Sequence, residues 1–374
     1  MNETPVDVIV IGAGIAGASV AWFLAPQARV VVLERESFAG FHTTGRSAAH
    51  FSESYGSPQV RALSRATRPF LEHPPVGFAA HPMLQRRGAL VIGNTEQAER
   101  VREAFDDVRR FTPALTLLDS EQIAARVPVL RPEAASIAFL EPDSADIDVN
   151  ELHQGFLRGA KAQGVALHVD TRVHAIRREG HEWIVNEQWR APVVVNAAGA
   201  WADAVAELAG VDTIGLEPRR RSAFTFATPS GIDAAGWPFV VDIDETFYFK
   251  PDAGLLLGSA ANADPTHPHD VQPEEYDIAL GIHRIEEATT MTIRRPARTW
   301  AGLRSFVADG DLVGGFAPDA PGFFWLAAQG GYGIQTSAAM AEACASMILG
   351  QPMPEHLANA GVTAELLTPA RLRR

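Results

Sequence analysis

Three segments of the chain repeat one pattern, in which a short apolar run precedes small residues and then helical spacing. The first is VDVIVI at 6–11, followed by GAGIAGASVAWFLA and by a second apolar run, RVVVLERE. Residues 191–210 and 322–350 repeat this order. A short continuous apolar run predicts a buried strand, and strands that alternate with helices predict a parallel sheet with crossover connections.

The segments between these repeats have another character. Residues 216–300 contain the alternating runs RSAFTFAT, ETFYFKP and GLLLGSA, which predict antiparallel strands, whereas 57–140 is rich in Arg, Pro and helical charge patterns. We therefore expect an α/β protein with two domains. One is a Rossmann-type dinucleotide-binding domain, and the other is a discontinuous α+β domain for the substrate, with an antiparallel sheet plus helices. The expected domain ranges are 1–56, 141–215 and 301–374 for the first, and 57–140 and 216–300 for the second.

Two stretches are expected to lie outside these elements. The Pro-rich residues 261–277 predict an exposed loop that leads into a helix, because Pro and Asp interrupt the hydrophobic periods of both strands and helices. Residues 351–374 are expected to form a tail of modest order.

Composition excludes several classes of protein. The 374 residues are 47% hydrophobic and 21% charged, as in an ordinary globular protein, and the formal charge of −13 would repel a phosphate backbone, so no nucleic-acid partner is expected. Cys344 is the only cysteine, which rules out an intrachain disulfide or a cysteine metal cluster. No metal site is predicted, and the THPH histidines (266–269) are expected to be solvated.

The N-terminal sequence MNETPVDVIVIGAGIAG lacks a basic n-region, so no secretory signal is predicted. No apolar run reaches the roughly 18 residues that a bilayer span needs. We expect a cytoplasmic protein with at most a peripheral contact at the inner face of the membrane.

The GAGIAG motif predicts dinucleotide binding. Gly12 permits the tight turn after the strand, Gly14 lets the backbone approach a pyrophosphate, and Gly17 lets the helix pack closely on the sheet. The helix N-terminus offers free N–H groups to the pyrophosphate, and Glu34 follows at the distance of a carboxylate that binds a ribose diol. The motif alone leaves NAD and FAD open.

Two further motifs favour FAD. The stretch GRSAAHFSESYG (45–56) brings the small residues Ser47, Ala48 and Ala49 to a position where an isoalloxazine ring could lie. In AAQGGYGIQTS, Gly330 and Gly333 stand at a predicted helix start, whose dipole would stabilise the negative charge that develops on a reduced flavin. The remaining predicted cofactor contacts are Arg35, Gly199, Tyr332 and Ile334.

The chain resembles the D-amino acid oxidase and glycine oxidase superfamily of FAD enzymes, and within it most closely the D-arginine dehydrogenases. The stretches that carry the resemblance are VIGAGIAGAS, VVVLERE, TGRSAAH, YGSPQVRAL, ADIDVNELHQGFLRG, VVNAAGAWADA, RRSAFTF, FYFKPDAG, TIRRPARTWAGLRSFVADGD and AAQGGYGIQTSAAM. The resemblance implies non-covalent FAD and the oxidation of an amino acid's Cα–N bond by hydride transfer to flavin N5. The imino acid then hydrolyses to a 2-oxo acid and ammonia.

The resemblance also implies roles for individual residues. Arg221 and Tyr248 match the residues that hold the substrate carboxylate, and a guanidinium fork with a phenol suits that group. Arg304 and the Gly331 carbonyl match positions near the α-carbon and the amino group. The catalytic set is completed by His50 and Tyr55 on the loop that closes over the site, and the substrate-binding set is Ser52, Glu53, Ala89, Phe239, Val241 and Gly331.

One position departs from the D-arginine dehydrogenases. Alignment without a gap puts Ala89 where they carry the glutamate that meets the substrate's guanidinium. We therefore predict a shift from cationic toward neutral, apolar or aromatic D-amino acids, unless Glu53 or Asp242, two acids new to this chain, restores the cation site. The expected partners are a small D-amino acid and an unidentified electron acceptor, such as a quinone or another carrier.

Other activities remain open on the sequence. An oxidase of D-amino acids, glycine or sarcosine that produces hydrogen peroxide would share these motifs, as would a flavin 2-hydroxy acid dehydrogenase. A flavin-dependent RNA-modifying or regulatory protein is disfavoured by the acidic charge, and a non-catalytic flavin module by the carboxylate clamp. No side chain is an obvious base for the amine.

Overall fold

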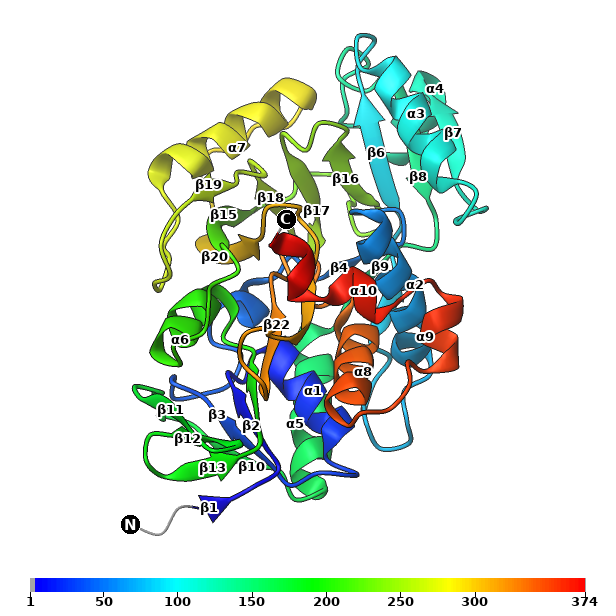
Figure 1. Cartoon of the computed structure of the whole chain (residues 1–374). Coiled ribbons are helices and arrows are strands. Elements are labelled where there is room, and N and C mark those ends of the chain that lie inside the picture. Colours follow the sequence, from blue (N-terminus) through cyan, green and yellow to red (C-terminus); the bar gives the residue numbers. More distant parts are fainter. Residues whose placement is uncertain (1–3, 374) are drawn as a thin grey trace.

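The computed structural model describes residues 4–373 and has two lobes (Figure 1). The lower lobe in this view contains a six-stranded sheet of order β10-β3-β2-β14-β22-β21, parallel except for β21. Its strands are β2 (Val8–Ile11), β3 (Val30–Leu33), β10 (Ala166–His168), β14 (Val193–Asn196), β21 (Val313–Phe316) and β22 (Phe323–Ala327). The α/β class and the parallel sheet predicted from the repeated pattern are confirmed.

Both faces of this sheet are covered. One face packs against helices, which explains why its central strands are continuous apolar runs. These helices are α1 (Ile15–Leu24), α8 (Ser337–Ile348) and, packed on α1, α5 (Val149–Ala162). The other face carries α6 (Ala202–Leu208) and a small sheet of β1 (Thr4–Pro5), β11 (Ile176–Glu179), β12 (Glu182–Val185) and β13 (Trp189–Ala191). This small sheet had no counterpart in the predicted elements.

The upper lobe is built on a nine-stranded, mainly antiparallel sheet, as the alternating runs predicted. Its order is β19-β15-β18-β17-β16-β6-β8-β7, with β20 beside β15. The strands are β6 (Ala89–Gly93), β7 (Thr116–Asp119), β8 (Ile137–Glu141), β15 (Glu217–Phe226), β16 (Phe239–Asp242), β17 (Tyr248–Asp252), β18 (Leu255–Ser259), β19 (Asp264–Pro265) and β20 (Arg298–Phe306). The helices of this lobe are α3 (Ala98–Val108), α4 (Ser120–Arg126) and α7 (Glu275–Ala288).

The two faces of the upper sheet have different neighbours. On β6, Leu90 and Ile92 enter the core beneath α7 and α4, whereas Val91 packs with α3. This alternation follows from the period of two along a strand. Ala89 and Val91 therefore share the α3 face, which also faces a cavity described below.

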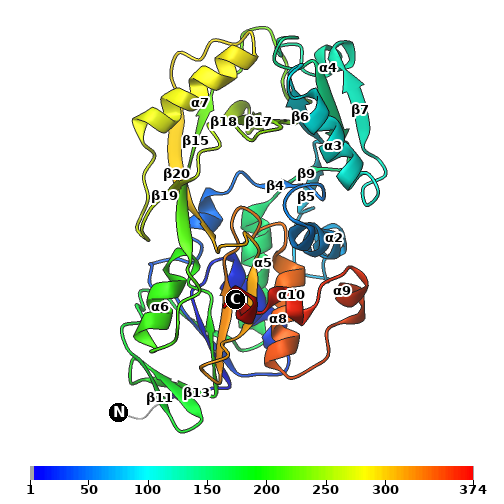
Figure 2. The same cartoon turned by 45° about the horizontal axis from the view of Figure 1, so that its top comes forward.

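Two elements link the lobes across the predicted domain limits (Figure 2). Helix α2 (Pro58–Glu72) lies in the predicted range 57–140 but packs through Val60 and Leu63 into the core of the lower lobe. Strand β20 crosses the predicted limit at residue 300 and pairs along its whole length with β15. The chain therefore reaches the upper sheet through paired strands rather than through a free linker. A third, short sheet of β4 (His50–Phe51), β5 (Leu84–Arg86) and β9 (Ala145–Ile147) lies between the lobes.

The tail prediction for 351–374 was wrong within the described residues. This segment forms α9 (Glu355–Asn359), α10 (Ala364–Leu367) and a 3-10 turn at Pro369–Leu372. Leu357, Val362 and Leu367 are buried in the core of the lower lobe, and this burial orders a segment whose local sequence carries little periodicity.

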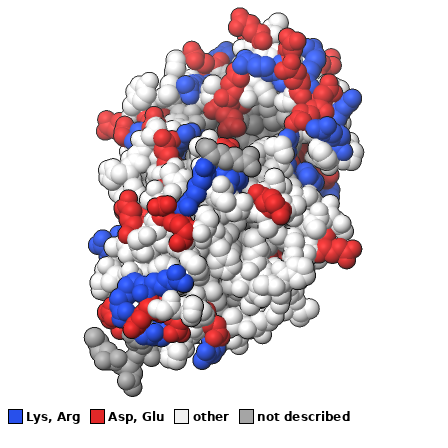
Figure 3. Space-filling view, viewed as in Figure 1, with Lys and Arg blue, Asp and Glu red and all other residues white. Residues whose placement is uncertain are grey.

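Charged side chains of both signs are interspersed on the face drawn in Figure 3. Surface ion pairs such as Arg177 with Glu187 and Arg190 with Glu182 belong to the small sheet. Across residues 4–373, no helix combines the length and the hydropathy that a bilayer crossing requires.

Candidate active site

The turn after β2 is shaped by glycines, as predicted. Gly12 has φ +99°, and a Cβ there would lie 2.5 Å from the carbonyl oxygen of Ala197. A Cβ on Gly17 would lie 1.9 Å from the carbonyl oxygen of Gly12, so helix α1 could not sit this close to the turn with any other residue. Gly14 is the N-cap of α1 and provides no side-chain cap, so the helix start can offer backbone N–H groups to an anion, apart from that of Ile15, which donates to Thr44 Oγ1.

Glu34 follows β3 and is buried, at 7% exposure. Its carboxylate accepts hydrogen bonds from the backbone N–H of Ala13, at 2.8 Å, and of Glu36, at 3.0 Å. Glu34 therefore stabilises the turn after β2, residues 12–14, which we call the phosphate turn. Glu34 also lines the cavity beside this turn. A carboxylate has about four lone-pair directions, so two remain for a ribose diol.

A cavity of about 190 Å³ runs from the turn to the end of β3. Gly12, Gly14, Glu34, Arg35 and Gly199 of the predicted set all line it. The Arg35 guanidinium lies over the Trp201 ring, 4.8 Å from its centroid, so the cavity has a flat cationic and aromatic wall suited to an adenine.

A second cavity, of about 130 Å³, continues from the first. Gly14, Thr44 and Gly199 line both. The second cavity is also lined by the predicted flavin contacts Ser47, Ala48, Gly330, Gly333 and Ile334, together with Gly331. The loop 45–56 and the glycine turn before α8 thus face the same space although nearly three hundred residues separate them in the chain.

The Rossmann turn, the two joined cavities and the glycine cradle fit an FAD molecule. The cavity at Glu34 and Trp201 matches the adenosine part of FAD, and the space between Ala48 and Gly330 matches the isoalloxazine part. Cys344 is fully buried in α8 and lines neither cavity, which agrees with non-covalent binding.

A third cavity, of about 260 Å³, opens from the second. The two share Arg221, Tyr248, Arg304 and Gly331, together with the small residues Ser47 and Ala48. The predicted carboxylate clamp therefore lies where the flavin space meets a separate pocket. Arg221 and Arg304 come from paired strands β15 and β20, and Tyr248 comes from β17.

The electrostatics of this pocket favour an anionic ligand. Arg221 donates from Nε to the backbone oxygen of Asn262, at 2.6 Å, and lies 6.0 Å from the Tyr248 ring centroid. Burial lowers the pKa of the Arg221 guanidinium, and the nearby Arg304 lowers it further. Neither arginine forms an ion pair with another of residues 4–373, although the charge of Glu245 favours the protonated form of both. A ligand carboxylate would relieve the remaining repulsion between them.

The lack of a side chain at Gly331 leaves room for Arg304 in its present position. A Cβ at this position would lie 2.8 Å from the guanidinium carbon of Arg304. Gly331 thus leaves room for the guanidinium while its backbone faces the pocket.

The loop 50–55 forms one wall of the pocket. His50 stacks on Phe239, with centroids 4.4 Å apart, and Phe239 stacks on Tyr248 at 5.2 Å. His50 Nε2 lies 2.6 Å from Ser144 Oγ, and burial lowers the pKa of this imidazole. The stack joins the loop to the carboxylate clamp.

Asp146 lies beneath this wall and neutralises a buried positive charge there. Burial alone would raise the pKa of Asp146, but the His50 imidazole, 3.6 Å away, and hydrogen bonds from Lys250 and Arg87 outweigh that effect and hold the pKa well below its usual range. Lys250 is itself 2% exposed and donates to Asp146 at 2.8 Å. The carboxylate therefore remains charged and neutralises the buried ammonium group.

Tyr55 reaches across the pocket. Its hydroxyl donates to Glu245 Oε2, at 3.2 Å, and burial raises its pKa. Glu245 lines the pocket from the β16–β17 turn with φ +53° and was not predicted. A positive φ on a non-glycine residue marks a constrained turn. The local sequence contains no motif that predicts the contact of Glu245 with Tyr55.

Three predicted residues are placed differently from expectation. The Glu53 side chain pairs with Arg68 and does not line the pocket. Asp242 borders the pocket, but its carboxylate accepts from Gln97 Nε2 at 2.9 Å and from Thr246 Oγ1 at 2.9 Å. Neither acid is free to replace a carboxylate at Ala89. Tyr332 lines none of the three cavities and packs on the Tyr55 ring at 5.1 Å.

The other predicted substrate residues do line the third cavity. They are Ser52, Ala89, Phe239 and Val241. Ala49, which was predicted to contact the flavin, lines this third cavity and not the second one. The residues that the sequence did not reveal come mostly from distant elements: Phe41, His42, Thr44, Trp201, Val91, Ala104, Phe139, Ile243, Glu245 and Gln335. Thr44 Oγ1, for example, accepts from the Ile15 N–H at 3.0 Å at the start of α1, and only the folded chain brings the two together.

The fold and the site define a dinucleotide-dependent oxidoreductase, with a cofactor channel that ends at an arginine-lined substrate pocket. The model of the FAD-dependent oxidoreductase family matches residues 7–347, and the chain belongs to this family. FAD is therefore its cofactor.

The chain is similar to several proteins of known sequence or structure. The chain is 24% identical, over 400 residues, to FAD-dependent oxidoreductase domain-containing protein 1 of Bos taurus, which covers 92% of this chain and 81% of that protein. The fold matches that of glycine oxidase from Geobacillus kaustophilus with a TM-score of 0.81 and 22% identity, covering 96% of this chain and 99% of the other. It matches L-proline dehydrogenase from P. horikoshii with a TM-score of 0.83 and 21% identity, covering 100% and 99%.

Proposed function

We propose that this protein oxidises D-amino acids to 2-oxo acids and ammonia, with FAD as the two-electron acceptor. The observation that carries the proposal is the placement of Arg221, Tyr248 and Arg304 between the flavin cavity and the third cavity. Two unpaired guanidinium groups and a phenol suit a substrate carboxylate, and their position at the junction would hold that carboxylate next to the cofactor.

The protein's own groups would orient the substrate. Arg221, Tyr248 and Arg304 line the pocket together with Gly331, so they can hold the carboxylate and the carbon next to it at the junction with the flavin cavity. Fixing a substrate in this way accounts for a large share of the rate enhancement in such reactions. Tyr55 and Glu245 border the same space, so they are polar groups that could contact a substrate amine.

The wall away from the clamp supports neutral substrates. Ala89, Val91, Ala104, Phe139 and Ile243 line it, and Val91, Ala104, Phe139 and Ile243 also pack into the apolar cluster under α3. Glu53 is paired to Arg68, and Asp242 accepts four hydrogen bonds, so this wall offers no free carboxylate to a guanidinium or an ammonium group. The acid that does line the pocket, Glu245, accepts from the Tyr55 hydroxyl, and its charge acts on the clamp arginines. We therefore infer a preference for neutral, apolar or aromatic side chains.

A second candidate is an amino acid oxidase that passes electrons to oxygen, which the fold shared with glycine oxidase supports. Comparing oxygen consumption with reduction of an artificial dye distinguishes a dehydrogenase from an oxidase. A dehydrogenase gives dye reduction without matching hydrogen peroxide.

Anaerobic bleaching of the visible flavin absorbance tests the proposed function. The substrates to compare are D-leucine, D-phenylalanine, D-arginine, the L-enantiomers, glycine and 2-hydroxy acids. Fast bleaching by D-leucine and D-phenylalanine is expected, whereas bleaching by 2-hydroxy acids alone would replace the proposal with a hydroxy acid dehydrogenase.

The matched variants are Arg221→Met and Arg221→Lys. Removing one partner of a buried charge pair costs about 2–5 kcal/mol, so Arg221→Met is expected to lower kcat/KM by roughly 30-fold to 5,000-fold. The flavin spectrum should remain, and Arg221→Lys should keep part of the activity. Unchanged turnover in Arg221→Met would reject the clamp.

A further inference from the structure

A buried carboxylate lies behind the substrate loop. Glu141 is the last residue of β8, is 0% exposed, and stands directly opposite Ala89 on β6. Phe139, two residues earlier on the same face, lines the substrate pocket. Glu141 therefore extends the pocket wall along β8, and residues 52–54 of the loop cover Glu141.

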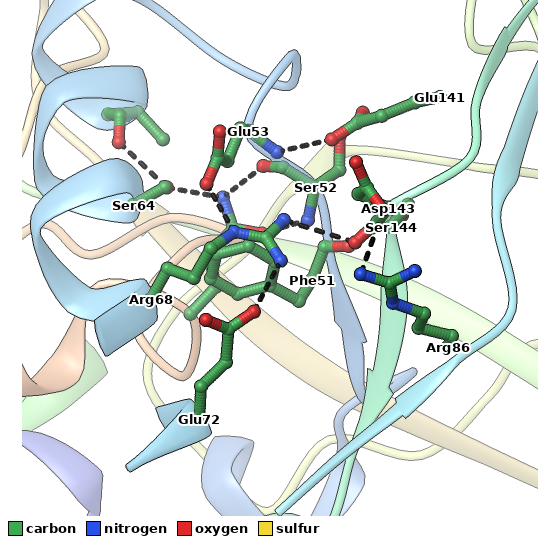
Figure 4. Close-up of polar contacts among 12 residues, drawn as sticks. Phe51, Ser52, Glu53, Ser64, Arg68, Glu72, Arg86, Glu141, Asp143 and Ser144 are labelled. Carbon is green, nitrogen blue, oxygen red and sulfur yellow. Dashed lines mark hydrogen bonds and ion pairs between the residues drawn. The ribbon is translucent and has the colours of Figure 1, made fainter. Parts of the chain in front are cut away.

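The Glu141 carboxylate bonds three consecutive residues of that loop. Oε2 accepts from Ser52 Oγ at 2.6 Å and from Ser54 Oγ at 2.5 Å, and Oε1 accepts from the Glu53 N–H at 2.8 Å. Figure 4 shows Glu141 turned toward the segment that carries Ser52 and Glu53. The next residue in the chain is Tyr55, which reaches across the pocket to Glu245.

Two other contacts hold the edges of the same loop. Gln335 Nε2 donates to the Ser52 carbonyl, at 3.3 Å, and to Ser64 Oγ, at 2.9 Å. Arg68 pairs with Glu53 and Glu72 and lies over the Phe51 ring at 4.8 Å (Figure 4). These contacts attach the loop to the turn before α8 and to α2, whereas Glu141 attaches it to the sheet that forms the pocket wall.

Burying a carboxylate costs desolvation free energy, so stability alone does not explain a buried glutamate here. Burial raises the pKa of Glu141, and the hydrogen bonds from Ser52, Ser54 and the Glu53 amide only partly offset this. Apolar side chains of similar volume often stabilise a protein as well as buried charges do. What Glu141 provides in addition is an acceptor with a fixed direction for three donors.

We propose that Glu141 is a positioning residue that holds residues 52–54, and through them Tyr55, against the substrate pocket. The role in substrate binding rests on the proposed function, but the effect on the loop does not. Glu141 touches neither the clamp residues nor the cofactor cavities, so it acts through the loop.

The test compares Glu141→Gln with Asp143→Asn in the flavin-loaded protein. Gln has the same shape but replaces one acceptor oxygen with a donor, so it cannot satisfy all three donors. Asp143 is two residues away, and its side chain pairs with the exposed Arg86, so its variant controls for the loss of a negative charge.

Amide hydrogen exchange gives the direct readout, because the Glu53 amide donates to Glu141. Exchange at residues 52–55 is expected to rise about tenfold or more in Glu141→Gln and to stay unchanged in Asp143→Asn. Equal exchange in wild type and a folded Glu141→Gln would overturn the proposal. This readout is independent of any substrate.

Kinetics give the second readout. In Glu141→Gln, the concentration of D-leucine that half-saturates anaerobic flavin reduction is expected to rise about tenfold, with the limiting rate within about threefold of wild type. Ser54→Ala should have a similar effect, and the double variant should add little to it. If the effects of Glu141→Gln and Ser54→Ala on half-saturation add in the double variant, the two residues act independently, and the proposal that Glu141 acts through the loop is overturned.

Two outcomes keep the inference separate from the proposed function. If no D-amino acid bleaches the wild-type flavin, the proposed function fails while the exchange result still decides the role of Glu141. If Glu141→Gln does not fold, Ser52→Ala and Ser54→Ala carry the test, and unchanged exchange and half-saturation in both would overturn the proposal.

Discussion

Replacing Ala89 with glutamate should convert the selectivity of the pocket toward cationic substrates. Ala89 is 5% exposed on β6, with Phe239 beside it on β16 and Glu141 opposite it on β8. A charge-assisted hydrogen bond contributes about 1.5–3 kcal/mol, which corresponds to roughly 10-fold to 150-fold in relative kcat/KM.

The neighbours of Ala89 reduce this gain. Directly opposite residues in an antiparallel pair have Cβ atoms about 5 Å apart, so the new carboxylate would meet the charge of Glu141. The apolar residues Val91 and Phe139 nearby add a desolvation cost until a cation binds. We therefore expect the lower end of the range, about a tenfold rise in the ratio of kcat/KM for D-arginine to that for D-leucine.

The assay measures kcat/KM for both substrates in the wild type, Ala89→Glu and Ala89→Gln. The glutamine variant fills the same volume without the charge. It should therefore lower kcat/KM for D-leucine without raising kcat/KM for D-arginine. An equal improvement in both variants would refute the charge argument. A wild-type protein that already prefers D-arginine would refute the reading of the pocket wall itself.

Three further predictions concern the cofactor turn, the clamp and the pH dependence of stability. Gly12→Ala should yield protein with little bound flavin, measured as the ratio of visible to ultraviolet absorbance, because its Cβ would lie 2.5 Å from the Ala197 oxygen. Gly331→Ala should displace Arg304 and lower kcat/KM by about tenfold or more, with the flavin spectrum retained. Burial lowers the pKa of His153, whose Nε2 bonds a carbonyl of the phosphate turn at 2.9 Å. Because the unfolded chain takes up this proton below about pH 6.5 and the folded chain resists it, stability should fall as the pH drops through about 6.5. The fall in melting temperature between pH 8 and pH 5 should be smaller in His153→Gln.

Elements built from local pattern were predictable from the sequence. The apolar runs and the spacing of Gly12, Gly14 and Gly17 located the parallel sheet and its phosphate turn, because each depends on residues close together in the chain. The clamp of Arg221 and Tyr248 came from resemblance rather than from periodicity, and the structure brings both residues to one cavity. The roles assigned to them stay predictions.

Contacts between distant segments were not predictable. Glu245 lies 190 residues from Tyr55, and Glu141 lies 88 residues from the Glu53 amide. Glu53 illustrates the same point in reverse: its place in the sequence suggested the pocket, but Arg68 on α2 turns its carboxylate away. Only tertiary packing decides which of several acids faces a cavity.

The pocket has two walls with separate neighbours, and this separation bears on how the protein can change. Arg221, Tyr248, Arg304 and Gly331 border both the flavin space and the substrate space, so substitutions there would disturb redox chemistry and binding together. The wall made by β6, β8 and α3 borders neither cofactor cavity. New substrate ranges can therefore evolve or be engineered on that wall in small steps while electron transfer is left intact.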